Sequence, residues 1–195
     1  MLQAFRNFLT RRTFAYKARN KAMNMFSSFE NFKAIRKKAE DSRKDANRPH
    51  EVLYFHKVDD PYSHLTIHFI EKFKSTYDVK FKSILVGEEN PAALHEPSLY
   101  TDYCLEDVKR IAPFYGVDFP GIDYPKKDLV NKANAILSAV SEEEFESIAK
   151  QVSHALWSGD QEKLNSLGES YQTSEAEVIE KLKTGNEIRN NCDYY

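Results

Sequence analysis

The sequence has few of the residues on which thiol and metal chemistry depend. Its 195 residues include two cysteines, Cys104 and Cys192, and no Cys-x-x-Cys pair. The six histidines are scattered, and no Cys/His cluster has the spacing of a zinc site. Isolated cysteines in helical surroundings are typical of buried thiols. We therefore expect two buried thiols rather than a redox pair, and no metal site.

Long apolar runs are also missing. No stretch of about 18 apolar residues is present, which excludes a membrane-spanning helix at the level of sequence. Met1 to Phe14 lacks the continuous apolar segment of a secretory signal, so the expected location is cytoplasmic. The 41% hydrophobic and 30% charged residues suit a soluble globular chain, with one domain or one domain and an appendage.

The charge is divided unevenly along the chain. Residues 1–50 hold thirteen Lys/Arg and four Asp/Glu, whereas the rest of the chain is acidic. Residues 1–46 contain no Gly or Pro and repeat apolar residues at helical spacing, which predicts a basic amphipathic helical arm over 1–49. Asn47-Arg48-Pro49-His50 breaks this pattern and predicts a domain boundary.

Several roles are open for this arm. Its aromatic face can pack on the rest of the protein or on a second copy, as a homo-oligomer. It can also lie on an anionic membrane surface through residues 1–46, or act as a transit peptide. Basic residues alone are weak evidence for nucleic-acid binding, which we do not expect.

Residues 51–87 predict a βαβ unit. Val52 to Val58 is rich in β-branched and aromatic residues and reads as a strand, followed by a helix from Tyr62 to about Phe73. Residues 77–86 alternate and predict a second strand, parallel to the first. Asp60 is the expected N-cap of the intervening helix.

Residues 97–195 are predicted to be almost entirely helical, after a loop over 88–96. The expected helices cover 97–115, 129–140, 142–158, 161–167 and 174–190. Ser141 and Glu144 form a capping box, and Gly168 is an expected break. In the first of these helices the candidate core positions are Leu99, Tyr103, Leu105, Val108 and Ile111.

The turn between the first strand and its helix carries the candidate site. Asp60 and Ser63 are the candidate catalytic residues, and the candidate ligand-binding residues are Pro61, Tyr62, His56 and His64. Asp60 can be a purely structural cap, a general acid or base assisted by Ser63 and Tyr62, or a ligand-binding group without chemistry. A histidine on an alternating strand, such as His56, is more typical of a core or surface position than of a proton shuttle.

Residues 50–195 resemble the DsbA-like thioredoxin superfamily. The strand Leu53-Tyr54-Phe55 leading to Asp60-Pro61-Tyr62-Ser63-His64-Leu65 carries the resemblance, together with the stretch from Leu99 to Pro120. The branch that it resembles contains 2-hydroxychromene-2-carboxylate isomerase and kappa-class glutathione transferase. The resemblance implies an α/β fold with a thioredoxin-like βαβ unit, a large helical insertion at 97–195, and glutathione as a cofactor.

Two departures from this family matter. Asp60 stands where the branch has the serine that acts on the glutathione thiol, and Ser63 stands where oxidoreductases have their second cysteine. No thiolate is therefore available at the turn for thiol–disulfide exchange. The resemblance also implies further strands after the helical insertion, so we expect the C-terminal half of the sheet to lie outside this sequence.

Three functional hypotheses follow from the sequence. The resemblance favours a glutathione-dependent isomerase or transferase relative. Asp60 favours a thioredoxin-like module that binds a ligand or partner without catalysis. The basic arm favours an assembly role, by self-association or on a membrane surface.

Overall fold

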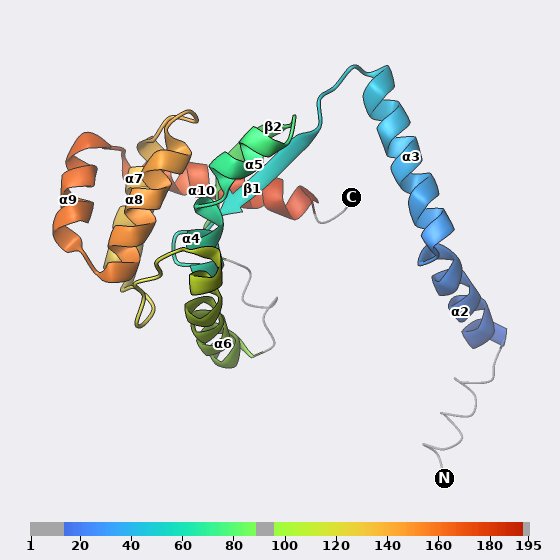
Figure 1. Cartoon of the computed structure of the whole chain (residues 1–195), viewed down its shortest axis with the longest axis horizontal. Helices are drawn as coiled ribbons and strands as arrows, with labels where there is room; N and C mark the ends of the chain where they lie inside the picture. The colour runs from blue at the N-terminus through green and yellow to red at the C-terminus, as the bar shows by residue number, and fades with distance from the viewer. Residues whose placement is uncertain (1–13, 89–95, 193–195) are drawn as a thin grey trace, which may run out of the picture. The chain divides into compact units, whose positions relative to one another are not determined.

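The computed structural model describes residues 14–88 and 96–192, and the chain divides into two compact units, residues 1–50 and 51–195. Figure 1 shows the elements of both units. The first 13 residues of the predicted arm and most of the predicted loop at 88–96 lie outside the described residues. In the part that is described, no helix combines the length and the apolar character needed to cross a membrane.

In residues 14–50, the described part of the first unit, the chain forms two helices, α2 (Phe14–Phe26) and α3 (Phe29–Asp45), instead of one continuous helix. The break falls at Ser28, whose backbone is extended and whose hydroxyl accepts a hydrogen bond from the Asn31 N–H at 3.2 Å. Serine favours such an N-cap over a helix interior, because its side chain replaces a backbone partner. Both helices carry exposed apolar side chains: Met23, Met25, Phe26, Phe29, Phe32 and Ile35.

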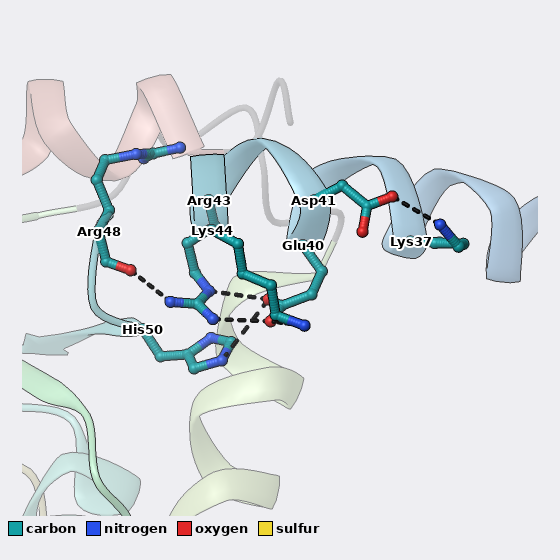
Figure 2. Close-up of polar contacts among 7 residues, drawn as sticks. All are labelled: Lys37, Glu40, Asp41, Arg43, Lys44, Arg48 and His50. Carbon is teal, nitrogen blue, oxygen red and sulfur yellow. Dashed lines mark hydrogen bonds and ion pairs between the residues drawn. The ribbon is translucent and has the colours of Figure 1, made fainter. Parts of the chain in front are cut away.

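The C-terminal end of α3 is fixed by a cluster of charged side chains, drawn in Figure 2. Arg43 donates from Nε and Nη2 to the two carboxylate oxygens of Glu40, at 2.8 and 2.7 Å, and from Nη1 to the Arg48 carbonyl. The hydrogen bond from Arg43 lowers the pKa of Glu40 to about 2. Asn47 adopts a positive φ of 48°, and the His50 ring lies 3.7 Å from Glu40. The first residues after the helix therefore fold back on its last turn.

The second unit begins with the parallel βαβ arrangement that the sequence predicts. The strands β1 (Glu51–His56) and β2 (Lys80–Leu85) are parallel, with Glu51 opposite Lys80 and His56 opposite Leu85. The single helix predicted for 62–73 is wrong, because the connection consists of α4 (Pro61–Ile67) and α5 (Ile70–Thr76). They are separated at His68 and Phe69, in a run of β-branched and ring-bearing residues with low helix propensity.

Beyond β2, the described residues of the second unit are mostly helical, as predicted. Its elements are α6 (Pro97–Ile111), the 3-10 helix η2 (Ala112–Tyr115), α7 (Lys127–Ala139), α8 (Phe145–Ser158), α9 (Gln161–Ser170) and α10 (Glu175–Cys192). The Ser141 hydroxyl accepts from the Glu144 N–H at 3.3 Å, which is one half of the predicted capping box. The Glu144 carboxylate accepts from the Ser141 hydroxyl and not from its backbone N–H, and α8 starts only at Phe145. The predicted break at Gly168 is wrong, since α9 continues through it to Ser170.

The main core lies between the sheet and the helices α7, α8 and α9. Its fully buried members include Ala133, Leu137, Ala149, Leu156 and Leu164, joined by Leu85 from β2 and Ile67 from α4. A smaller cluster of Leu65, Ala112 and Val117 packs α4 against η2 and the turn after it. The helical segment and the βαβ unit thus share one apolar interior.

The predicted core face of α6 is only half right. Leu105 and Val108 are buried, but Leu99 and Tyr103 are 69% and 62% exposed. Nine residues separate Leu99 from Val108, which is two and a half helical turns at about 3.6 residues per turn, so the two side chains lie on opposite faces. The helix packs through its Cys104-Leu105-Val108 stripe.

Helix α10 approaches β2 very closely at Gly185. A Cβ atom added there would overlap the carbonyl oxygen of Leu85 and lie 3.3 Å from the Ile84 methyl group. The next residue, Asn186, accepts a hydrogen bond from the Gly87 N–H at 3.1 Å. Glycine is the residue that permits this contact, and it fixes α10 beside the end of β2.

Candidate active site at the β1–α4 turn

Asp60 is the N-cap of α4, and Pro61 is its first residue, which confirms the two sequence predictions for this turn. The Asp60 backbone is extended, and its Oδ2 atom accepts hydrogen bonds from the Ser63 N–H and the Ser63 hydroxyl, both at 2.7 Å. The Ser63 hydroxyl in turn accepts from the Lys57 N–H at 3.3 Å. The two candidate catalytic side chains therefore contact each other directly.

The Asp60 carboxyl is partly buried, and this changes its proton affinity. Burial raises the pKa of Asp60 above the ordinary aspartate value. The hydrogen bonds from Ser63 and the charge of Lys57 act in the opposite direction, and burial is the larger effect. Lys57 also forms an ion pair with Asp59 at 2.9 Å. The carboxyl is thus better suited to hold a proton than an exposed aspartate.

A pocket of about 490 Å³ opens beside this turn. Its walls come from the end of β1 and the turn after it, the residues that follow β2, α6, the segment before α7, and α10. The residues that matter below are Lys57, Asp60, Pro61, Ser63, Tyr100, Cys104, Tyr124 and Arg189. The volume is within the range of small-molecule sites, about 300–1,000 Å³. The site can therefore accommodate a small molecule against the Asp60–Ser63 pair.

The thiol in this pocket is not activated. Cys104 is 2% exposed, and burial raises its pKa, which a hydrogen bond to Tyr100 only partly offsets. A raised pKa keeps the group as a thiol at neutral pH, and the thiolate is the nucleophile. Cys192 is exposed, so the expectation that both thiols are buried is right for Cys104 and wrong for Cys192; neither is in a disulfide.

Tyr62 connects α4 to α6 and does not line the pocket. Its hydroxyl donates a hydrogen bond to Asp107 Oδ2 at 2.6 Å. Burial and this hydrogen bond raise the pKa of Tyr62. Tyr124 does line the pocket, and its hydroxyl donates to the Thr101 carbonyl at 3.0 Å. Both tyrosines hold α6 in place beside the turn.

His64 points away from the pocket and is fully buried. Its Nε2 atom lies 3.0 Å from the Asp118 carbonyl and its Nδ1 atom 2.9 Å from the Ser153 hydroxyl. Because a carbonyl only accepts, Nε2 carries the proton and Ser153 donates to Nδ1. Burial lowers the pKa of His64 to about 4. The structure therefore gives His64 a place between α4, α8 and the segment after η2, rather than against a ligand.

His56 is also fully buried and does not line the pocket. Its Nδ1 atom lies 2.8 Å from the Tyr54 hydroxyl, which donates to the Ser63 carbonyl at 3.1 Å. With that hydroxyl proton used, His56 Nδ1–H is the donor to Tyr54. Its Nε2 atom is buried and has no hydrogen-bond partner among the described residues. Burial, then the charge of His64, lowers the pKa of His56 to about 3, so the ring stays neutral near pH 7.

The pocket contains residues that the sequence analysis did not single out. Lys57, Tyr100 and Tyr124 carry no motif, and Arg189 comes from a helix far along the chain. Lys57 stands next to the turn, which was the one signal that could have included it. Arg189 depends on the close contact of α10 with β2, and no local pattern indicates that contact.

Within the described residues, no group of three or more His, Cys, Asp or Glu side chains is placed to hold a metal ion. His64 and His68 lie near each other, with ring centroids 5.1 Å apart, but both nitrogens of His64 are occupied by hydrogen bonds.

Comparison with known proteins adds no candidate function, because no family model matches the sequence and no curated protein shows significant similarity to it.

Proposed function

We propose that this protein is a DsbA-related, thioredoxin-like module that binds a small molecule beside the β1–α4 turn without thiol–disulfide exchange. The parallel β1–β2 pair, with the pocket at the turn into α4, supports the thioredoxin-like assignment. The observation that carries the proposal is the pair of 2.7 Å hydrogen bonds from Ser63 to Asp60 Oδ2. On this assignment, Asp60 places a carboxyl group where the resembled branch has a thiol or hydroxyl.

The residues at the turn do not fit glutathione bound through its thiolate. A helix N-terminus attracts an anion through its unpaired N–H groups and its dipole. Here the Ser63 N–H is already bonded to Asp60, and a charged Asp60 would repel a second anion. Cys104, the nearby thiol, is buried and protonated. The isomerase or transferase hypothesis is therefore supported by resemblance, and the site chemistry favours a module that does not activate glutathione.

Calorimetric titration of the full chain with glutathione tests this proposal. We expect no binding heat from the wild type and restored binding in Asp60→Ser. Asp160→Ser is the matched control, because Asp160 is also an aspartate N-cap, of α9, and does not line the pocket. S-methylglutathione, which has no ionisable thiol, separates repulsion of the thiolate from general loss of affinity. Micromolar binding of glutathione by the wild type would contradict the proposal.

The binding role itself needs a positive measurement. In an amide NMR screen with a fragment library, we expect hits that shift the signals of Lys57, Tyr100 and Arg189 together, because these residues line one pocket from three segments. Hits should lose affinity in Tyr100→Ala, whose side chain reaches the pocket from α6. A library that yields no ligand at these residues would argue against a small-molecule site.

A second candidate is acid–base catalysis by Asp60 on a bound molecule. The raised pKa of Asp60 that burial produces favours it, since a general acid works best when its pKa lies near the working pH. A ¹³C titration of the Asp60 carboxyl measures this directly. A pKa at or below about 4, the value of an unperturbed aspartate, would remove the support for catalysis.

A further inference from the structure

Asp60 lines the pocket beside the β1–α4 turn and forms no ion pair within the part of the chain that the structure describes. The other acidic side chains of the lining are paired: Asp59 with Lys57 at 2.9 Å, and Glu88 with Lys127. The charge of Lys57 acts on Asp60, but the two are not in an ion pair. The charge of the Asp60 carboxylate is therefore left for a bound molecule to balance.

Asp60 also keeps some capacity to accept hydrogen bonds. An ionised carboxylate has about four acceptor sites. The Ser63 N–H, the Ser63 hydroxyl and the Tyr62 N–H fill three of them. A ligand that donates a hydrogen bond and carries a positive charge would fill the remaining site and balance the charge, and such charge-assisted hydrogen bonds are the stronger kind.

Aromatic rings form much of the lining around this carboxyl group. Tyr100 comes from α6, Tyr124 from the segment before α7 and Phe55 from β1. The Tyr124 ring is held by its hydrogen bond to the Thr101 carbonyl and by an edge contact with Trp157, with 5.5 Å between the ring centroids. Aromatic faces attract organic cations, and the attraction is stronger where water is excluded. The walls therefore suit a cation with an apolar body.

The charge of Asp60 acts on other side chains of the pocket. Burial raises the pKa of Cys104 and of Tyr124, and the negative charge of Asp60 raises both further. The two groups therefore stay neutral near pH 7 and report a negative potential in the part of the pocket around Asp60. Arg189, the remaining cation of the lining, has an interaction of its own.

We propose that the molecule bound beside the β1–α4 turn is an organic ammonium ion. This inference rests on the proposed function and names its class of ligand. The protonated amine donates a hydrogen bond to Asp60, and the apolar group lies against Tyr100 and Tyr124. An anion held by Lys57 is the less favourable alternative, because it would compete with Asp59 for that lysine and would be repelled by Asp60.

Three ligands of similar size and different charge test the proposal: benzylammonium, benzyl alcohol and benzoate. In NMR titrations of the full chain near pH 7, followed at the amides of Lys57, Tyr100 and Arg189, benzylammonium should bind at least about tenfold more tightly than benzyl alcohol, and benzoate most weakly. Asp60→Asn keeps the N-cap and removes the charge, so the preference for the cation should disappear. Asp160→Asn, at the N-cap of α9 and outside the pocket lining, should leave the preference unchanged.

Binding of the cation should also change the proton affinity of Asp60. A bound cation favours the carboxylate, so saturating benzylammonium should lower the pKa of Asp60 in a ¹³C titration, and benzyl alcohol should not. By the same linkage, the affinity for benzylammonium should fall as the pH drops through the pKa of Asp60.

The outcomes separate this inference from the proposed function. Equal binding of benzyl alcohol, or tighter binding of benzoate, would overturn the ammonium inference and leave small-molecule binding in place. A preference for the cation that survives in Asp60→Asn would also overturn it, because another group would then recognise the charge. If none of the three ligands binds at millimolar concentration, the inference fails, and the proposed function fails with it only if the fragment screen also yields no ligand.

Discussion

Replacing Gly185 by alanine should release α10 from the sheet. The new methyl group would overlap the backbone carbonyl of Leu85, which cannot rotate away as a side chain can. Helix and strand must separate, and the Asn186–Gly87 hydrogen bond is lost with them. The substitution therefore tests whether the α10–β2 contact is as close as the structure shows.

Two effects of opposite sign determine the magnitude. Overpacking of a close contact costs about 1–3 kcal/mol, and more where the backbone has to shift. Alanine in a helix interior is favoured over glycine by about 1 kcal/mol. Because the obstacle here is backbone, we expect overpacking to dominate and a net loss of about 2 kcal/mol. In a chain of this size that loss lowers the midpoint of thermal unfolding by about 4–8 °C.

Gly168 provides a matched control in a neighbouring helix. It lies inside α9, and a Cβ atom added there meets its nearest neighbour, the Ile136 side chain, at 4.0 Å. Gly168→Ala keeps the gain in helix propensity without the overlap, so it should stabilise the fold by about 0.5–1 kcal/mol. Urea unfolding followed by circular dichroism measures both variants. The two substitutions are chemically identical and are expected to change stability in opposite directions.

Hydrogen exchange distinguishes global unfolding from local release of the helix. If α10 detaches while the rest of the fold stays intact, amides in residues 175–192 lose protection although the global midpoint moves little. A Gly185→Ala protein with unchanged or greater stability and with unchanged protection of α10 would refute the reasoning. The contact with Leu85 would then not exist in solution.

Three further predictions concern the turn and its surroundings. As pH falls from 6.5 to 5, the free energy of unfolding should fall by about 2 kcal/mol for each of His56 and His64. Their folded pKa values of about 3 and 4 lie below that of an unfolded histidine, so the unfolded chain takes up protons first. A urea midpoint that does not change over this pH range would contradict the prediction. Asp60→Ala should lower the free energy of unfolding by about 1 kcal/mol through loss of the N-cap, and Asp60→Asn should lower it much less, because asparagine caps equally well. Equal losses of stability in thermal unfolding would show that the carboxylate charge, and not capping, stabilises the turn. Tyr62→Phe should cost about 1–2 kcal/mol by removing the hydrogen bond to Asp107, and a change below about 0.5 kcal/mol would show that α6 is held by its apolar stripe alone.

Local signals in the sequence were sufficient for the βαβ unit and for the capping of α4. Asp60 followed by Pro61 is a strong helix start whose physics involves only neighbouring residues, and the structure confirms it. The two strands were recognisable because β-branched and aromatic residues gather in short runs. Their parallel pairing followed from the length of the connection between them.

The sequence predictions were wrong where tertiary contacts determine which side chains are buried and where a helix ends. Leu99 and Tyr103 fit a helical repeat as well as Val108 does, and only the position of α4 determines which stripe of α6 is buried. Gly168 resembled a helix end, yet nothing opposes a continuous helix at that point. His56 and His64 stand close to Asp60 in sequence, but both rings turn into the interior instead of the pocket. Sequence proximity to a candidate site does not determine the direction of a side chain.

The close contact between α10 and β2 at Gly185 also links the stability of the fold to the pocket beside the β1–α4 turn. Gly185 and Arg189 are one turn apart on α10, so they lie on the same face of the helix. The first holds the helix against β2, and the second reaches the pocket. A ligand that contacts Arg189 and the β1–α4 turn together would bridge α10 and the sheet, and would stabilise the docked helix by mass action. Ligand binding should then slow hydrogen exchange throughout α10, and Gly185→Ala should weaken binding although position 185 itself does not line the pocket.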